Sequence, residues 1–374
     1  MFDQIREDTI YTMLYAVVMA MAAVASIYLL FRRGNAFAAD VTPPKRLRRW
    51  TAAFMAVCAV GHLWYMPVVM LDSGEAVMLS MLIGALLDCI LTIPLALIVM
   101  LCMLQDRQRP LWPVSVMVAP LVVGMVAYIF TLSDVILFIL RVYFLLMSIG
   151  FIIYMTHAVR QYSQWLRENY ADLEHKEVWQ SFLVLATIML MFGYYVSGAS
   201  GMTYEYIIQV SGIILICYLL WRVETLSDLT VSQPLPIEEE TIAPVSPSED
   251  DSPSSETLSD AAYEKIASLL QQHCVDTQLY LQHNLNISQL AQIIGTNRTY
   301  LSKYFAMQGI TYNAYINDLR IRHFVRLYSE AVATQHFFTV QELASQSGYH
   351  SYNTFAFAFK QRMGKSVTEW KHET

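Results

Sequence analysis

Seven long apolar runs constrain the fold of this chain more than any other feature of its sequence. Each run is free or nearly free of charged residues, and most reach the roughly 20 residues that a helix needs to cross about 30 Å of hydrocarbon. Lipid offers the backbone no hydrogen-bonding partners, so each run must close its own hydrogen bonds as a helix. The runs cover approximately residues 10–31, 50–71, 77–104, 111–132, 135–155, 178–196 and 206–221. The sequence therefore predicts an all-α fold that begins with about seven transmembrane helices.

The basic residues between these runs predict the orientation of the bundle. Alternate connections contain eleven lysines and arginines, whereas the other connections and the N-terminal tail together contain only Arg6. Cytoplasmic loops of membrane proteins are enriched in Lys and Arg. We therefore expect a multi-pass protein of the bacterial cytoplasmic (inner) membrane, with its N-terminus outside and everything after Trp221 in the cytoplasm. Asp3, Glu7 and Asp8 argue against a cleavable signal peptide, which begins with basic residues.

The distribution of charge divides the chain into three parts. Residues 1–223 contain 14 basic and 14 acidic residues, residues 224–258 contain nine acidic and no basic residues, and residues 259–374 contain ten basic and eight acidic residues. Prolines, serines and acids fill the middle part, which can bury too little apolar surface to repay the entropy of ordering it. We expect a transmembrane sensor or anchor at 1–223, a disordered linker at 224–258 and a DNA-binding domain at 259–374. The linker is either a spacer or a regulatory segment.

Patterns typical of enzymes and metal sites are not found in the sequence. The five cysteines form no CxxC pair, which argues against a disulfide scaffold or a zinc ribbon. The chain also contains no HExxH, GxSxG, Walker or paired-carboxylate motif. We therefore expect no enzymatic activity, no metal ion and no cofactor.

The C-terminal part contains a pattern that is typical of a helix-turn-helix. Ala291 allows two helices to approach closely, Gly295 can adopt a left-handed turn four residues later, and Thr296 or Asn297 can cap the next helix. On that helix an inward stripe and an outward polar face alternate with helical period. The inward stripe comprises Tyr300, Leu301, Tyr304 and Phe305, and the outward face comprises Arg298, Thr299, Ser302 and Lys303. A polar and basic second helix is the shape that enters a DNA major groove.

A second copy of this pattern follows. Ala344 and Gly348 repeat the four-residue spacing, and Phe355 and Phe359 repeat the spacing of the buried residues with one extra residue in the turn. Between the copies, residues 312–328 predict a helix. The basic residues near its end are Arg320, Arg322 and Arg326. One copy alone resembles any tightly packed helical hairpin, but two copies joined by a basic helix are far more specific for DNA binding.

Together these residues resemble the DNA-binding domain of the AraC/XylS family of bacterial transcription regulators. The resemblance covers about residues 260–373, and its motifs in the second copy are Gly348-Tyr349, Phe355, Phe359-Lys360 and Gly364-Lys365-Ser366. It implies an all-helical domain whose two helix-turn-helix units, joined by one long helix, read adjacent major-groove faces of double-stranded DNA. We further expect regulation of transcription with RNA polymerase as a partner, as an activator or as a repressor. Two residues depart from the family pattern: Phe357 replaces a basic residue, and Val367 replaces a proline.

The resemblance assigns recognition helices to residues 297–305 and to about residues 351–360. The candidate DNA-binding residues are Asn297, Arg298, Thr299, Ser302 and Lys303 in the first helix, and His350, Ser351, Tyr352, Asn353, Phe357 and Lys360 at the second. Arg298 is the candidate for a base contact, because a guanidinium can bridge O6 and N7 of guanine. The candidates for phosphate contacts are Arg322 and Arg326, together with Lys303 and Lys360. Arg320 can instead hold the central helix in place through an intramolecular pair, and we expect this as much as a contact with DNA. We expect Phe357 to pack into the core and not to contact the methyl group of thymine.

Three ionisable residues, His62, Asp88 and Arg141, lie inside apolar runs near the expected centre of the bilayer. Charge is costly there, so such residues normally pair with one another or serve a function. An Asp88–Arg141 pair would either lock two helices together or belong to a sensor cavity or a proton-linked switch.

These features favour a membrane-anchored one-component regulator that binds promoter DNA sequence-specifically in response to an envelope or membrane signal. Its expected partners are double-stranded DNA, the lipid bilayer, RNA polymerase, a second copy in a homodimer, and a signal ligand of unknown identity. The alternative is a membrane transporter or receptor with a regulatory DNA-binding or protein-docking tail. A transporter would usually show an inverted repeat with broken helices, and Pro67 and Pro94 are too little to indicate one.

Overall fold

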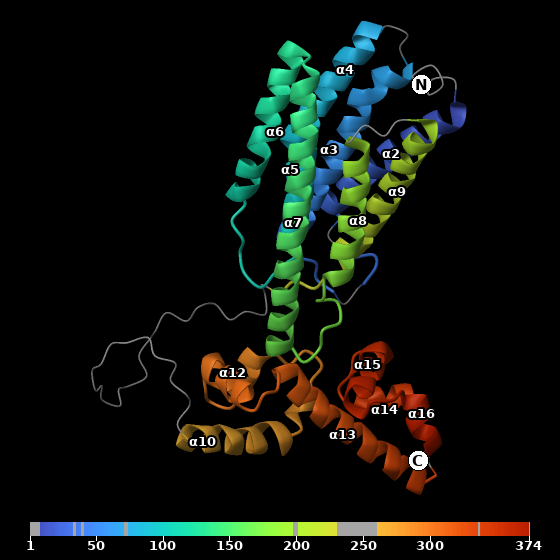
Figure 1. Ribbon diagram of the computed structural model, residues 1–374. Coiled ribbons are helices and arrows are strands. Elements are labelled where there is room, and N and C mark those ends of the chain that lie inside the picture. Colours follow the sequence, from blue (N-terminus) through green and yellow to red (C-terminus); the bar gives the residue numbers. More distant parts are fainter. Residues whose placement is uncertain are drawn as a thin grey trace, which may run out of the picture. The chain divides into compact units, whose positions relative to one another are not determined.

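Helices form nearly all of the regular structure in this chain (Figure 1). The computed structural model describes residues 8–32, 35–38, 41–70, 74–196, 201–229, 260–335 and 337–373, and no β-strand occurs among them. The predicted all-α fold is therefore confirmed. The chain divides into an N-terminal unit, residues 1–163 and 175–230, and a C-terminal unit, residues 164–174 and 231–374.

Most helices of the N-terminal unit begin and end close to the predicted apolar runs, but the helix predicted over residues 135–155 continues to Asn169. The helices are α2 (Thr9–Phe31), α3 (Lys45–Met70), α4 (Gly74–Leu87), a π-helical turn η1 (Asp88–Thr92), α5 (Ile93–Cys102), α6 (Trp112–Thr131), α7 (Asp134–Asn169), α8 (Trp179–Val196) and α9 (Met202–Thr225). α4, η1 and α5 continue one another as a single 29-residue span. Helices therefore form at all seven predicted positions.

Five spans among the described residues are long and apolar enough to cross a membrane. They are Thr9–Phe31, Gly74–Cys102, Trp112–Thr131, Asp134–Asn169 and Met202–Thr225. The other two predicted crossings correspond to α3 and α8. α3 begins with a basic segment, so its apolar part is shorter than the helix, and the apolar part described for α8 is Trp179–Met191.

The outward faces of these spans are apolar. Only 22–28% of each span is buried inside the bundle, while Val123, Phe130 and Phe138 on α6 and α7 are 66–84% exposed. Exposing such an apolar surface to water costs free energy, whereas contact with hydrocarbon does not. The N-terminal unit therefore has the composition and length of a membrane-inserted helix bundle.

Polar contacts hold the end of α9 and the residues after it against other parts of the N-terminal unit. Glu224, near the end of α9, is fully buried and lies 3.4 Å from the Arg48 guanidinium of α3. Beyond α9, the Leu229 N–H donates to Gln105 Oε1 at 2.9 Å, and Gln105 Nε2 donates to the Ser227 carbonyl at 2.9 Å. The first residues of the predicted linker, 224–229, therefore pack within the N-terminal unit. Residues 230–259 lie outside the described residues.

The C-terminal unit is built around one long central helix, as the family resemblance implies. Its helices are α10 (Asp260–Leu270), the π-helical turn η2 (Gln271–Val275), the 3-10 turn η3 (Leu279–Leu281), α11 (Ile287–Ile293), α12 (Arg298–Met307), α13 (Tyr312–Ala333), α14 (Val340–Gln346), α15 (Tyr352–Met363) and α16 (Val367–Glu373). The first half of α13 contributes Tyr312 and Ile316 to a core with α11 and α12. Its second half contributes Phe324 and Tyr328 to a core with α14, α15 and α16. Two helix-turn-helix units thus share α13.

The short helices of both helix-turn-helix units start at residues whose side chains cap the helix. Asn286 and Gln289 form a capping box at α11, and Thr339 and Glu342 form another at α14. Each box satisfies two backbone donors that a helix start leaves unpaired. The recognition helices α12 and α15 start at Asn297 and Ser351, whose side chains accept backbone hydrogen bonds. These caps explain why both recognition helices begin within one residue of their predicted start.

The turn glycines of the two units differ in one testable respect. Gly295 and Gly348 both have left-handed backbones, with φ of +72° and +86°. A Cβ at Gly295 would meet open space, whereas a Cβ at Gly348 would lie 2.7 Å from the Leu281 carbonyl oxygen. A left-handed alanine costs about 1–2 kcal/mol, and overpacking against backbone adds about 1–3 kcal/mol. We therefore expect Gly348→Ala to destabilise the C-terminal unit clearly more than Gly295→Ala.

Urea-dependent pulse proteolysis of the full-length protein, scored on cleavage of the C-terminal unit, measures this difference. Gly295→Ala is the matched control, because it introduces the same backbone strain without the collision. Equal losses of stability in the two variants would show that the backbone at Gly348 does not approach the Leu281 carbonyl closely.

Candidate nucleic-acid interface

The first recognition helix, α12, presents its predicted reading residues at its first turns. Arg298, Thr299 and Lys303 are exposed, and Ser302 is half-buried. Asn297 is exposed too, but its Oδ1 accepts a hydrogen bond from the Tyr300 N–H at 2.8 Å. Asn297 thus has a structural role as the N-cap of α12, in addition to its predicted role at the DNA.

Tyr300 does not belong to the inward stripe of α12 that the sequence predicted. Its side chain is 50% exposed, whereas Leu301, Tyr304 and Phe305 are buried. At 100° per residue, Tyr300 lies about 100° from the centre of the face that these three residues share. The periodicity therefore places Tyr300 at the edge of the stripe, where the structure turns it outward beside Arg298 and Thr299. Sequence reasoning missed it as a candidate for stacking or phosphate contact.

The second recognition helix, α15, also exposes its predicted residues. Tyr352, Asn353 and Lys360 are exposed on the helix. His350, exposed just before it, lies with its ring 6.1 Å from that of His283. Ser351 accepts a hydrogen bond from the Thr354 N–H at 3.3 Å as the N-cap of α15. Both helices therefore point a polar N-terminal turn away from their cores.

Phe357 is 69% exposed, so the expectation that it packs into the core is wrong. The core positions of α15 are taken by Phe355, Ala358 and Phe359. Phe357 lies two residues after Phe355, about 200° around the helix, and therefore faces outward. An exposed phenyl ring on a recognition helix is suited to contact with the methyl group of thymine.

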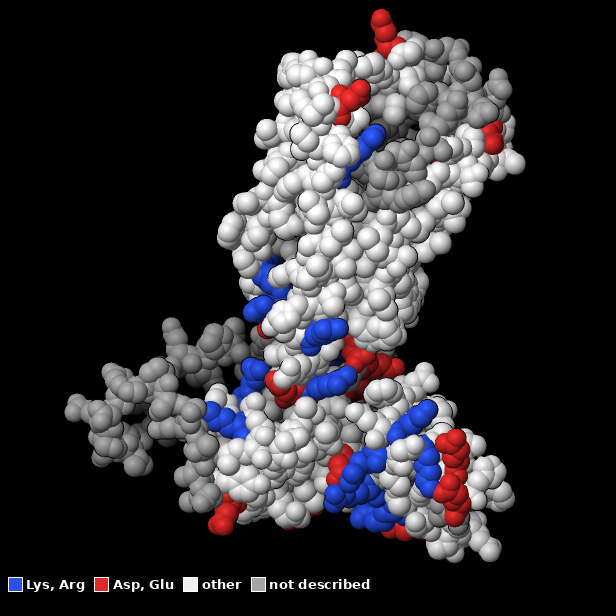
Figure 2. All heavy atoms as spheres, viewed as in Figure 1, with Lys and Arg blue, Asp and Glu red and all other residues white. Residues whose placement is uncertain are grey.

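The candidate phosphate-binding arginines are tied to acids of the same unit. Asp318 lies 2.5 Å from the Arg322 guanidinium and also pairs with Arg362 of α15, while Arg326 lies 3.8 Å from Glu330. Figure 2 shows basic and acidic side chains alternating on the visible face of this unit. Exposed pairs of this kind contribute only about 0–1 kcal/mol, so a phosphate can displace the acid. The sequence did not single out Arg362, since its partner lies 44 residues away.

Arg320 is buried and has a structural role. It is 1% exposed, and its guanidinium donates to the carbonyls of Tyr280 and Gln282 at 2.7 Å each. It also lies 5.5 Å from the centroid of the Tyr349 ring. Burial lowers the pKa of Arg320, and the two carbonyls compensate part of its lost hydration. Arg320 thus joins α13 to the turn of the second helix-turn-helix unit and to the loop around η3.

Two other ionisable residues of this unit are buried in its interior. Burial raises the pKa of the Cys274 thiol to about 12, so this cysteine stays protonated. Burial and the neighbouring Arg326 both lower the pKa of His323. At neutral pH both groups are uncharged and are not available for phosphate contacts.

The structure gives Asp88 and His62 different hydrogen-bond partners, although the two residues lie close enough to interact electrostatically. Asp88 accepts hydrogen bonds from Tyr65 of α3 and from Thr92, each at 2.8 Å. The rings of His62 and Tyr15 lie 4.7 Å apart, and His62 Nε2 lies 3.2 Å from Gln209 Oε1. Arg141 forms no ion pair with Asp88. Asp88 lies at the start of η1, and π-helical turns are frequent at functional sites.

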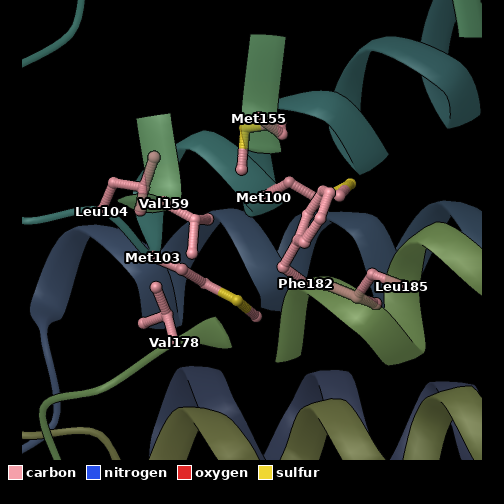
Figure 3. Close-up of a pocket in the computed structure, with 8 residues that line it drawn as sticks. All are labelled: Met100, Met103, Leu104, Met155, Val159, Val178, Phe182 and Leu185. Carbon is pink, nitrogen blue, oxygen red and sulfur yellow. The ribbon is translucent and has the colours of Figure 1, made fainter. Parts of the chain in front are cut away.

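The cavities described in the membrane bundle are apolar. Figure 3 shows one at which Met100, Met103, Met155 and Phe182 converge, with a volume of about 10 Å³. This is about the size of one water molecule, and an apolar lining would keep it dry. A second, of about 270 Å³, lies between α6 and α7 and is lined mainly by aliphatic residues. Neither has the convergent polar groups of a typical ligand site, and among the described residues no cluster of three or more His, Cys, Asp or Glu could hold a metal ion.

Comparison with known proteins identifies the C-terminal unit. Residues 290–373, from α11 to the end of α16, match the family model of a helix-turn-helix domain, of the AraC type. This domain is a DNA-binding module of transcription regulators and is not catalytic. No curated protein and no solved structure matches the chain significantly. The resemblance drawn from the sequence is thus confirmed over residues 290–373.

The two neighbouring arginines of α13 allow a direct test of the role of Arg320. Arg320→Met keeps the length of the side chain but leaves the carbonyls of Tyr280 and Gln282 unpaired, at a cost of about 1–3 kcal/mol for each group. We expect a loss of about 2–6 kcal/mol from the free energy of unfolding of the C-terminal unit. Arg322→Met, which removes an exposed pair, should cost about 0–1 kcal/mol. Pulse proteolysis in urea compares the two, and similar losses would contradict the structural role of Arg320.

Proposed function

We propose that the protein is a membrane-anchored one-component transcription regulator. Its C-terminal AraC-type domain binds promoter DNA sequence-specifically through α12 and α15. The N-terminal helix bundle holds this domain at the bacterial cytoplasmic membrane and responds to a signal in the envelope or the membrane. RNA polymerase and a second copy of the chain are the further partners of this proposal.

One observation carries the proposal: a DNA-binding domain and a set of membrane-length apolar helices occur in the same chain. Residues 290–373 match the AraC-type domain, and five spans before residue 226 can each cross a bilayer. An anchored domain searches only the DNA that comes near the membrane. Its effective concentration there is set by the tether, without any new contact.

The distribution of basic residues supports a cytoplasmic location for the DNA-binding domain. Eleven lysines and arginines lie in alternate connections of the bundle, whereas the other connections and the N-terminal tail together contain only Arg6. By the positive-inside rule the connections with the eleven basic residues are cytoplasmic. Seven crossings, the five long spans together with α3 and α8, would bring the chain after α9 to the same side.

Arg298 is the residue with which to separate base reading from general affinity for DNA. If its guanidinium bridges O6 and N7 of a guanine, Arg298→Ala will cost about 1–3 kcal/mol at the operator and relax the preference at one base pair. If it touches phosphate, the variant will weaken binding to all sequences alike and make the salt dependence shallower. We expect the first result, measured on operators recovered by crosslinking the intact protein to the genome in living cells.

Lys303→Ala is the matched control on the same helix. A phosphate contact at Lys303 predicts a uniform loss of affinity and a salt slope that is smaller by about one unit. If intact protein in membrane fractions recovers no operator, sequence-specific regulation by this chain is ruled out.

The topology is tested with reporters that are active on one side of the membrane only. A fluorescent protein fused after Glu373 should fold and emit in the cytoplasm, and alkaline phosphatase at the same position should be inactive. The same two reporters inserted between α6 and α7, near Leu132, should give the opposite result, because that connection is predicted to lie outside. Phosphatase activity at the C-terminal fusion would overturn the proposal.

A further inference from the structure

The end of the membrane helix α7 forms part of the DNA-binding unit. α7 runs without interruption from Asp134 to Asn169 and includes one of the five membrane-length spans. Its last residues and the turn that follows, residues 164–174, group with the C-terminal unit and not with the bundle. The turn segment 170–174 therefore connects a membrane span directly to the residues that read DNA.

Residues 170 and 171 pack into the first helix-turn-helix unit. Tyr170 forms an antiparallel β-bridge with Asn286, the N-cap of α11. Ala171 is 1% exposed and lies in the same core as the buried face of α12. Its carbonyl accepts hydrogen bonds from Asn313 Nδ2 at 2.7 Å and Asn317 Nδ2 at 3.2 Å, both on α13. A segment from the membrane helix thus completes a core that the C-terminal residues do not fill alone.

Residues 172 and 174 contact the second unit. Glu174 Oε2 accepts a hydrogen bond at 2.8 Å from the hydroxyl of Thr354, in the first turn of α15. Asp172 is 6% exposed. The nearby Asp172 and Tyr349 favour the charge of Arg320, although burial remains the main effect and lowers the pKa of Arg320. Asp172 is therefore close enough to Arg320 to favour its charge. Arg320 is the residue that joins α13 to the turn of the second helix-turn-helix unit.

Five consecutive residues thus hold the starts of α11 and α15 at the same time. A protein that reads two adjacent major-groove faces needs a fixed separation between its reading helices, because the faces recur every 10–10.5 base pairs. The geometry points to residues 170–174 as the positioning element that sets the separation and orientation of α12 and α15. Movement of α7 in the membrane then passes to the DNA through this segment. The inference rests on the proposed function, since it needs both the anchor and the DNA.

The test uses the full-length protein in nanodiscs of phosphatidylethanolamine and phosphatidylglycerol. Glu174→Ala removes the contact to α15, and Asn313→Ala with Asn317→Ala removes the contacts to Ala171. Glu168→Ala is the matched control, because Glu168 is on the same helix and its hydrogen bond is to Gln164, one turn away. Affinity is measured for the operator and for versions with 5 or 10 base pairs inserted between the two half-sites.

We expect the wild type and Glu168→Ala to lose most of their affinity when 5 base pairs are inserted. Glu174→Ala and the asparagine double variant should bind the natural operator about 2–10-fold more weakly, because the first loses one positioning hydrogen bond and the second loses three. Their affinity should also depend less on the number of base pairs between the two half-sites, because the two helix-turn-helix units are no longer held at a fixed separation. An unchanged spacing profile in both variants, or tighter binding by Glu174→Ala, would overturn the inference.

Hydrogen exchange separates this inference from the proposed function. In Glu174→Ala, amides at the first turn of α15 should exchange faster, and in the asparagine double variant amides of residues 170–171 should do so. These readouts need no DNA. If the wild type binds no operator, the proposed function fails, and exchange alone then decides the positioning role. Unchanged exchange in both variants would overturn it.

Discussion

A backbone in hydrocarbon has no partner other than itself, and the architecture of this chain follows from that constraint. It forces the apolar runs into helices and favours connections, caps and ion pairs at the ends of the bundle. The interactions of Arg48 with Glu224 and of Gln105 with the chain after α9 are found at such an end. A domain that must meet DNA can only be attached there. The boundary between the two units falls within the last turns of α7.

The features that could be predicted from the sequence are those encoded by local spacing. Apolar runs of span length predicted the membrane helices, and helices formed at each position. The Ala–Gly spacing, a cap at Thr296 or Asn297, and the family resemblance predicted two helix-turn-helix units whose recognition helices start within one residue of the observed start. A glycine with positive φ and a side chain that caps a helix act over three or four residues. Their effect is therefore visible in a single sequence.

The features that could not be predicted depend on contacts between distant residues. Tyr300 and Phe357 are aromatic, and the sequence alone favoured a core position for both, yet the structure exposes them. Their positions on the helices, at the edge of the buried face for Tyr300 and opposite it for Phe357, outweigh their aromatic character, and Phe355 and Phe359 pack against Phe324 instead. Asp88 could be recognised as costly in a membrane, but its partners Tyr65 and Thr92 are neutral residues without any charge signal. Likewise, nothing in residues 170–174 marks them as part of a core that begins about a hundred residues later.

This last contact changes how the acidic segment between the two units should be understood. If residues 230–259 were the only connection, a protease that cut them would release a complete DNA-binding domain. The C-terminal unit, however, takes Ala171 into its core and binds Glu174 through α15, and both residues remain covalently attached to α7. A cut in the acidic segment would leave the unit held by these contacts. Its release would require exposing the core around Leu290 and Leu301, which costs about 25 cal/mol for each Å² of apolar surface. Under the proposed function, a signal carried by a change in α7 would therefore disrupt the unit less than release would.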